Sequence, residues 1–266
     1  KSLTIDNDKS KEALNTIYKF TPFLFFTTET ERLFISSPSN RRNFIDRLIF
    51  THNLNYNKLV NQYNTNILER SNMLKNFNDF DSNWIDIIEK KIASLGLQIY
   101  FLREKQIDSI LKYLNKFLIQ FNLDFKINIK LNDSYYKEKF DEEFFAQKLK
   151  NNRKEDSLIG GSKIGPHKSD YVFYVNSNFL VSQLSTGQQK TLILLIYLSQ
   201  SKYLIEVFEK KPILLLDEVC SHLDDLNRSI LLTLVESFEI QTFMTGTTKK
   251  LFSFLSTNTN FYNITS

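Results

Sequence analysis

The sequence predicts an α/β protein with a mixed β-sheet and an inserted helical arm, and three observations support this. First, a turn at Gln183–Lys190 precedes a long apolar run that is typical of a buried helix. Second, Ile213–Leu216 is apolar but too short for a helix, which indicates a buried parallel strand. Third, residues 44–122 are mostly helical in period. We expect the arm to interrupt the sheet-forming segments.

The bulk composition sets limits on function. The 266 residues have a formal net charge of +4, which is compatible with nucleic-acid binding but does not require it. The single cysteine, Cys220, excludes an internal disulfide framework and a cysteine zinc cluster. No charge-free segment has transmembrane length, and the first residues do not resemble a signal peptide. We therefore expect a soluble, cytoplasmic protein without a membrane partner.

The first predicted elements are a strand at 3–5, a helix at 9–20 and a strand at 22–26. A helix follows Ser37 and places Arg41 and Arg42 in its first turns. These two arginines are candidates for contacts with DNA phosphates. The alternative is one structural ion pair, with Asp46 or Glu31, and one solvated charge.

The helical region predicts an antiparallel hairpin, because its period breaks at 76–83 and resumes at Trp84. Its second helix has a heptad-like stripe, which is more often core packing than a partner surface. The stripe consists of Leu95, Ile99, Leu102, Gln106, Ser109 and Tyr113.

The later elements follow from alternation and helical period. The predictions are strands at 125–131, 171–175, 240–244 and 260–264, helices at 138–151, 225–238 and 249–255, and a charged loop at 152–156.

The turn before the apolar helix has the properties of an anion site. Ser185 is positioned to cap the helix, and Gln188, three residues later, completes a capping box. Gly187 leaves the backbone N–H groups open to a phosphate, which the helix dipole also favours. The alternative is an ordinary capped core helix.

The strand at 213–216 ends in two adjacent carboxylates. Ligands of open α/β sheets lie beyond the carboxyl ends of the strands. We therefore assign Asp217 to Mg²⁺ and Glu218 to orienting or deprotonating an attacking water. The alternative is that this pair merely starts a solvated loop.

Three motifs in order resemble those of ABC-type ATPases. Leu184–Gln188 resembles the signature motif, Ile213–Glu218 the Walker B strand and Ser221–Asp224 the D-loop. Ser37–Asp46 and Gly165–Asp170 are similar to segments of RecF recombination-mediator proteins, as is the ending Thr242–Thr247.

The resemblance implies an ABC/SMC-type ATPase head with three parts. Residues 1–43 would be the remainder of the N-terminal lobe, 44–150 the arm or second-lobe insertion, and 151–266 the C-terminal lobe. It also implies ATP and Mg²⁺ as cofactors and an ATP-dependent homodimer. In that dimer Ser185, Gly187 and Gln188 meet the nucleotide of the partner, while Ser221 and Asp224 belong to the D-loop.

The sequence departs from this pattern in two places. No Gly-x-x-x-x-Gly-Lys-Ser/Thr loop, the Walker A phosphate cradle, occurs in it, so we expect a missing first section and leave open whether the chain is an ATPase. Gly246 stands where transporter subunits usually have histidine, which makes Thr245 and Thr247 the candidate γ-phosphate sensors.

The function implied by the resemblance is DNA replication, repair and recombination mediation, as in the SOS response to DNA damage. Such a protein clamps duplex DNA at gaps with single-stranded DNA, supports recombinase loading and works with RecO and RecR. The alternatives are a non-hydrolysing remnant and, less favoured because of the arm, an ABC transporter subunit. His167, beside Lys168 and Asp170, has no metal-ligand spacing to another His or Cys and is interpreted as a structural histidine.

Overall fold

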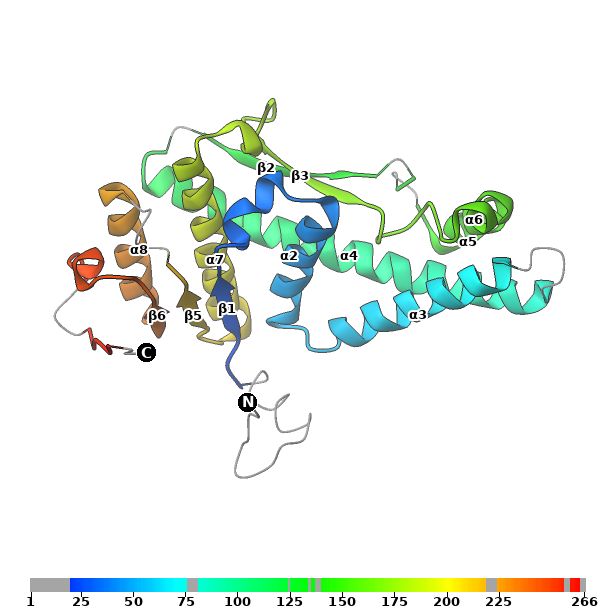
Figure 1. Ribbon diagram of the computed structural model, residues 1–266, viewed down its shortest axis with the longest axis horizontal. Helices are drawn as coiled ribbons and strands as arrows, with labels where there is room; N and C mark the ends of the chain where they lie inside the picture. Colours follow the sequence, from blue (N-terminus) through cyan, green and yellow to red (C-terminus); the bar gives the residue numbers. More distant parts are fainter. Residues whose placement is uncertain are drawn as a thin grey trace, which may run out of the picture.

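The computed structural model describes residues 20–75, 81–123, 125–133, 135–136, 140–218, 224–255 and 259–263. The strand expected at 3–5, nearly all of the helix expected at 9–20, and both Cys220 and Ser221 lie outside these residues. The molecule is elongated, with a head that contains a parallel sheet at one end and a helical arm at the other (Figure 1).

The head is built on a parallel sheet in the order β1-β5-β6, from β1 (Phe23–Phe26), β5 (Ile213–Leu216) and β6 (Thr242–Met244). Leu24 and Phe26 point into the core, and so do Leu214 and Leu216 of the paired strand. All three strands were predicted from their sequences, although β6 begins two residues later than predicted.

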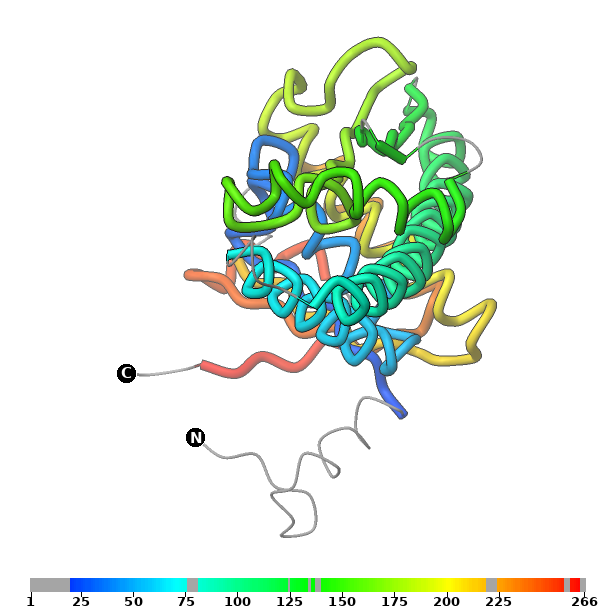
Figure 2. The backbone as a smooth tube through the Cα atoms, turned by 90° about the vertical axis from the view of Figure 1, so that its right-hand side faces the viewer, coloured from blue at the N-terminus to red at the C-terminus, as the bar shows by residue number. Residues whose placement is uncertain are grey.

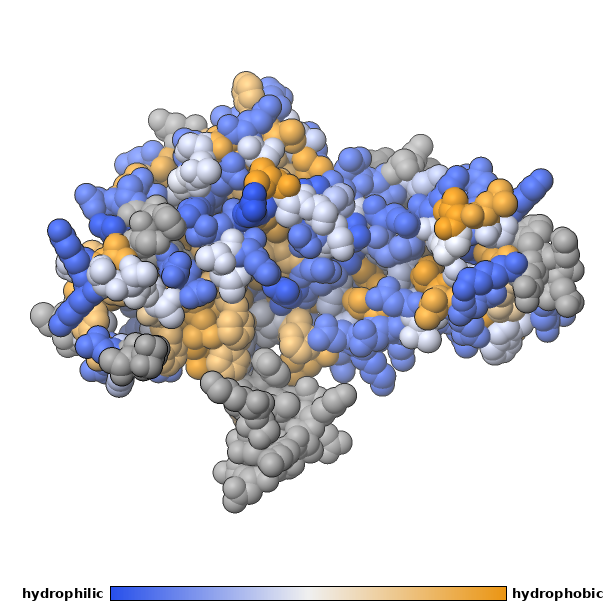
Figure 3. All heavy atoms as spheres, in the orientation of Figure 1, coloured by the Kyte–Doolittle hydropathy of each residue, from blue (hydrophilic) through white to orange (hydrophobic). Residues whose placement is uncertain are grey.

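The outer face of this sheet is apolar. Phe25, Leu215 and Phe243 are in register across the three strands. Phe25 and Phe243 are 53% and 51% exposed, and apolar atoms gather over β1 and β5 in Figure 3. The described residues therefore bury only one face of the sheet.

A second, antiparallel sheet has the order β2-β3-β4, from β2 (Ile127–Asn132), β3 (Asp170–Val175) and β4 (Phe179–Leu180). The predicted α/β class is confirmed, but the strands of the described residues form two sheets instead of one mixed sheet. The strand predicted at 260–264 is wrong where it is described, because residues 259–263 form no strand and expose Phe261 and Tyr262.

Helix α7 (Thr186–Phe208) is the core helix of the head. Among the described helices it is the one long and apolar enough to cross a membrane, but 72% of its most apolar window is buried in the molecule. It packs against α4 and α8 (Asp225–Phe238), and Asp224 caps α8 at the backbone N–H of Asn227. The apolar surface of α7 is therefore part of the hydrophobic core of the head.

The arm is the predicted antiparallel hairpin. Helix α2 (Pro38–Phe50), capped by Ser37, leads into α3 (Tyr56–Lys75), which packs along α4 (Ser82–Gln120). Figure 2, which looks along the arm, shows α3 and α4 side by side. The stripe on α4 is indeed core packing at Ile99, Gln106 and Tyr113.

Helices α5 (Glu142–Asn151) and α6 (Arg153–Ile159) cover the outer end of the arm. The charged loop predicted at 152–156 is therefore wrong. Its charges are ion-pair partners instead, because Asp156 is buried against Arg70 of α3, while Arg153 bonds to Glu89 of α4.

Short 3₁₀ segments complete the chain at η1 (Thr30–Ile35), η2 (Val181–Gln183) and η4 (Lys249–Phe252). The helix expected at 249–255 is thus only a 3₁₀ turn, and none of the η4 residues is buried. Without a buried face, this segment has little to stabilise a longer helix.

Candidate functional site

The carboxyl ends of β5 and β6 bring together three of the predicted site residues. The hydroxyl of Thr245 donates to Oδ1 of Asp217 at 2.6 Å and accepts from the backbone N–H of Glu218 at 3.0 Å. The backbone N–H of Asp217 donates to the carbonyl of Phe26 at 3.0 Å, and that of Thr245 to Leu216 at 3.0 Å. Both carboxylates and the threonine are exposed, so the cluster faces solvent.

Glu218 has an unusual backbone. Its φ of 54° is in the left-handed region, which non-glycine residues adopt rarely and which is found disproportionately at functional sites. Sequence reasoning could place Glu218 at the strand end but could not show this turn.

Gly246 has a packing reason to be glycine. A Cβ there would lie 2.8 Å from the Phe252 ring of η4. A histidine at this position, as in transporter subunits, would displace that ring. Thr247 is exposed and has no side-chain hydrogen bond to a described residue.

The second predicted cluster is the start of α7. Ser185 Oγ accepts the backbone N–H of Gln188 at 3.3 Å, and the Gln188 side chain accepts the backbone N–H of Ser185 at 3.1 Å. The predicted capping box is therefore confirmed. All residues from Ser185 to Gln188 are exposed, so the amino end of α7 opens to solvent.

Gly187 has no internal reason to be glycine. A Cβ at this position would meet nothing within 4 Å, and its φ is outside the left-handed region. The free space lies above the first turn of α7, where the backbone N–H groups of Thr186 and Gly187 have no hydrogen bond to a described residue. This is the geometry expected of a surface that another molecule approaches closely.

The two clusters face the same end of the head. Segment η1 follows the end of β1 and packs on both α7 and η2. Lys190, in the second turn of α7, pairs with Glu31 of η1 at 2.8 Å. Because β1 and β5 are parallel and in register, Asp217 lies on the η1 side of the sheet.

The two arginines proposed for DNA are held by the protein itself. Arg41 forms a bidentate pair with Asp170, with both N–O distances at 2.8 Å, and Arg42 donates to the carbonyl of Ser169 at 2.6 Å. The ion-pair alternative named the wrong partners, because Asp46 pairs with Arg103 and Glu31 with Lys190. A role of Arg41 and Arg42 on DNA stays a prediction.

His167 is a structural histidine, as expected. Its Nδ1 lies 2.7 Å from the hydroxyl of Tyr63, and its Nε2 lies 3.2 Å from the carbonyl of Ser162. Since a carbonyl only accepts, the Nε2–H donates to Ser162 and the hydroxyl of Tyr63 donates to Nδ1. Burial lowers the pKa of His167 to about 4, so the ring is neutral.

Gly165 explains the close packing of this segment. Its φ is 123°, and a Cβ would lie 2.3 Å from the Tyr63 hydroxyl. The carbonyl of the next residue, Pro166, accepts from Arg103 of α4 at 2.6 Å. Residues 162–170 therefore join α2, α3 and α4 to the antiparallel sheet.

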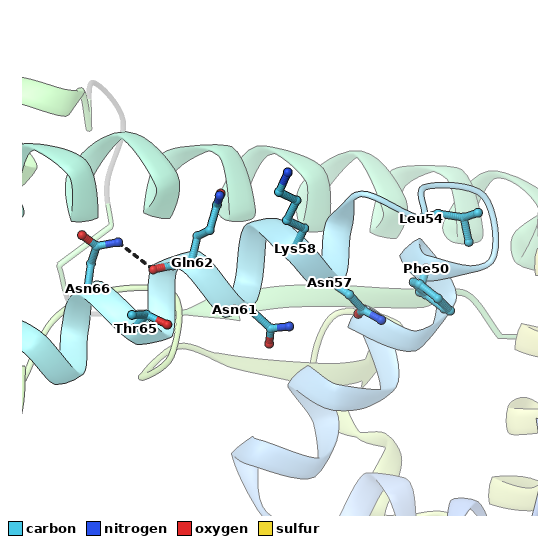
Figure 4. A pocket seen from close by; sticks show the side chains of 8 residues that line it. All are labelled: Phe50, Leu54, Asn57, Lys58, Asn61, Gln62, Thr65 and Asn66. Carbon is cyan, nitrogen blue, oxygen red and sulfur yellow. Dashed lines mark hydrogen bonds between the residues drawn. The ribbon is translucent and has the colours of Figure 1, made fainter. Parts of the chain in front are cut away.

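A trough of about 510 Å³ lies on α3, away from both clusters. Four of its eight lining residues are amides, and Lys58 is the one charged lining residue (Figure 4). Its lining contains no carboxylate, so we do not place chemistry there.

No protein-family model matches the chain. Curated relatives do match: the DNA replication and repair protein RecF of Rickettsia bellii (strain OSU 85-389) is 32% identical over 254 residues, covering 93% of this chain and 69% of that protein. The chain belongs to the RecF family. The RecF protein of Rickettsia felis is 32% identical over 247 residues and is covered over 66% of its length.

Two solved structures extend the match to the fold. The recombination mediator protein RecF-ATP of the RecFOR pathway superposes with a TM-score of 0.74 at 28% identity, covering 85% of this chain and 62% of that one. The RecF-ATPrS structure gives a TM-score of 0.77 at 26% identity, with coverages of 93% and 68%. The chain thus shares the RecF fold over most of its length and spans about two thirds of these proteins.

Sequence reasoning missed Arg103, and it included Gln106 in the stripe on α4 without its hydrogen bond. Arg103 is 4% exposed and binds both Asp46 oxygens at 2.7 Å, and buried Gln106 bonds to Gln200 of α7 at 2.7 Å. The sequence contained a signal for these contacts, because Arg103 and Gln106 are polar residues within an otherwise apolar face of α4.

Proposed function

We propose that this chain acts in DNA replication and repair as a RecF-type recombination mediator, in the cytoplasm. In this proposal it forms an ATP-dependent homodimer that clamps DNA at gaps and supports recombinase loading with RecO-like and RecR-like partners. The family membership supports the broad role. The observation that supports the dimer is the exposed, capped and unobstructed start of α7.

The nucleotide chemistry divides between the two clusters. Asp217 presents an exposed carboxylate, and Mg²⁺ in nucleotide sites is usually held by one or two carboxylates together with phosphates and water. No group of three or more His, Cys, Asp or Glu side chains within the described ranges forms a metal cage, so the ion would arrive with its nucleotide. The magnesium ion would neutralise phosphate charge.

The protein residues would then have separate tasks. Asp217 would hold the cation, Glu218 would orient the attacking water, and Thr245 would keep the Asp217 carboxylate in place through its 2.6 Å bond. Ser185, Gly187 and Gln188 would contact the nucleotide of the opposite protomer. Thr247 and the D-loop pair, Ser221 and Asp224, complete the proposed set.

The first test is steady-state ATP hydrolysis by the chain with Mg²⁺. We expect a background rate, because the 266 residues contain no Walker A sequence to position the γ-phosphate. Robust turnover that is abolished by Glu218→Gln would contradict this expectation.

The second test uses a joined version, defined as this chain fused to the Walker A segment of a RecF relative. We expect ATP to cause dimerisation in light scattering, and Ser185→Arg to prevent it by placing a cation against the partner's nucleotide site while monomer nucleotide binding persists. Normal dimers of Ser185→Arg contradict the sandwich. A joined version that binds no ATP supports the non-hydrolysing remnant.

A further inference from the structure

Three lysines form a row on the solvent side of α4. Lys105, Lys112 and Lys116 are exposed, and their spacing of seven and four residues places them on one helix face. None of the three has an ion-pair partner among the described residues. The first and last are about 16 Å apart along the helix axis, at 1.5 Å per residue.

The row lies beside the carboxyl-terminal half of α7, to which Tyr113 of α4 is hydrogen-bonded. Lys112 and Lys116 lie over the ring of Tyr113, at 5.2 and 5.8 Å from its centroid. The Tyr113 hydroxyl donates to Glu206, which also pairs with Lys202 at 3.1 Å. Glu206 is thus already paired, whereas Lys112 and Lys116 contact the Tyr113 ring and have no ion-pair partner among the described residues. One exposed carboxylate, Asp108, lies between Lys105 and Lys112 and lowers the net positive charge of the row.

The charges of this region act on two neighbouring titratable groups. Burial, and after it the charges of Lys105 and Lys210, lowers the pKa of His52 to about 4. A hydrogen bond from Tyr113, and then the charges of Lys202 and Lys116, holds the pKa of Glu206 below its ordinary value.

An exposed aromatic ring continues the row. Phe101 is 63% exposed and lies one helical turn before Lys105 on the same face of α4. A line of cations with an open aromatic side chain is the combination that binds single-stranded nucleic acid, because phosphates meet the cations and a base stacks on the ring.

We propose that Phe101, Lys105, Lys112 and Lys116 form a binding row for single-stranded DNA, with phosphates on the lysines and a base on Phe101. This inference rests on the proposed function and refines it. The row provides cations that the described residues leave unpaired, in contrast to Arg41, whose guanidinium is already bound to Asp170.

The row lies apart from the nucleotide-facing end of the head. Lys202 and Lys210 are near the carboxyl end of α7 and just beyond it, whereas Ser185 caps its amino end. The helix is 23 residues long, or about 35 Å. DNA on the row would therefore leave the dimer surface at Ser185 open.

The experiment is fluorescence anisotropy of the full chain with a labelled single strand and with a duplex of the same length, across a salt series. The double variant Lys112→Gln, Lys116→Gln should reduce the slope of log K against log salt by about 1.4 for the single strand. Phe101→Ala should weaken single-strand binding roughly tenfold and duplex binding much less.

The matched controls lie on the same helix. The double variant Lys90→Gln, Lys91→Gln makes the same charge change outside the row, and Ile119→Ala removes an exposed aliphatic side chain. Both should behave as the parent, and thermal unfolding should show all variants equally folded, since every changed side chain is exposed.

The outcomes separate the two proposals. A parent that binds DNA while the row variants bind like the controls would overturn the row alone, and so would a parent that binds only duplex. A parent that binds neither form of DNA would overturn the row, while the ATP-dependent clamp is judged on DNA binding by the joined version with ATP and Mg²⁺.

Discussion

Thr245 and Asp217 are joined by a 2.6 Å hydrogen bond between residues 28 positions apart in the sequence. The bond connects the end of β6 to the end of β5, so the candidate metal ligand is fixed by the neighbouring strand. It gives a concrete role to a threonine that the sequence suggested only as a γ-phosphate sensor.

Thr245→Val should therefore lower the free energy of unfolding by about 1 kcal/mol, because a charge-assisted bond is lost at an exposed site. Urea denaturation measures this. Thr247→Val is the control and should change the free energy of unfolding little, since the Thr247 side chain has no hydrogen bond to a described residue. Equal effects of the two variants would show that the Thr245 bond adds nothing.

Gly187→Ala should stabilise the chain by about 0.5 kcal/mol, because alanine favours a helix and its Cβ meets no atom within 4 Å. The same methyl group should weaken ATP-dependent dimerisation of the joined version, since it fills the space left for the partner's nucleotide. Gly161→Ala, also in open space, is the control for dimerisation. A variant that is stabilised and dimerises normally would count against the assignment of Gly187.

Arg70→Met should lower the free energy of unfolding by about 3 to 5 kcal/mol. Arg70 is 1% exposed and bonds to Glu89 and Asp156 at 2.8 Å each, so its removal leaves the buried Asp156 without its cation, while Glu89 retains its pair with Arg153. Lys163→Met breaks an exposed pair with Glu155 and should cost less than about 1 kcal/mol. Chemical denaturation compares the two, and similar losses would contradict the buried network.

Acid should destabilise the protein before its carboxylates titrate. Burial lowers the pKa of His52 and of His167 to about 4, against about 6.5 in an unfolded chain. Between these values the unfolded chain binds more protons, so stability is complete above pH 6.5 and falls as the pH drops toward 4. We expect a loss of about 2 kcal/mol for each histidine between pH 7 and 5.

Denaturation curves at pH 7 and pH 5 measure this loss. His167→Gln should make the protein less stable at pH 7 but should remove about half of the pH dependence. An unchanged pH dependence in that variant would assign the effect to other groups.

Local patterns predicted those parts of the fold that local interactions determine. The capping box of Ser185 and Gln188 was readable because its partners are three residues apart. The strand at Ile213–Leu216 could be predicted because an apolar run of four residues is too short for a helix and is typical of a buried strand. The two candidate clusters could be named because each occupies the end of such an element.

The errors have a common physical origin in long-range pairing. In sequence, residues 152–156 resemble a solvated loop. In the structure Asp156 is buried, because it pairs with Arg70, which is 86 positions earlier in the chain. Arg41 was assigned nearby partners, yet it bonds to Asp170, which is 129 positions later. Periodicity contains no information on such pairs, so the alternative for Arg41 named the wrong acids.

Residues 162–170, which join α2, α3 and α4 to the antiparallel sheet, have a consequence for synthesis on the ribosome. Arg41 emerges 129 residues before Asp170, which at 5 to 20 residues per second means a delay of about 6 to 26 s. Tyr63 similarly precedes His167 by 104 residues. For that time the nascent α2 and α3 lack the segment that joins them to the head, which makes this stage of translation the one at which a chaperone has most to protect.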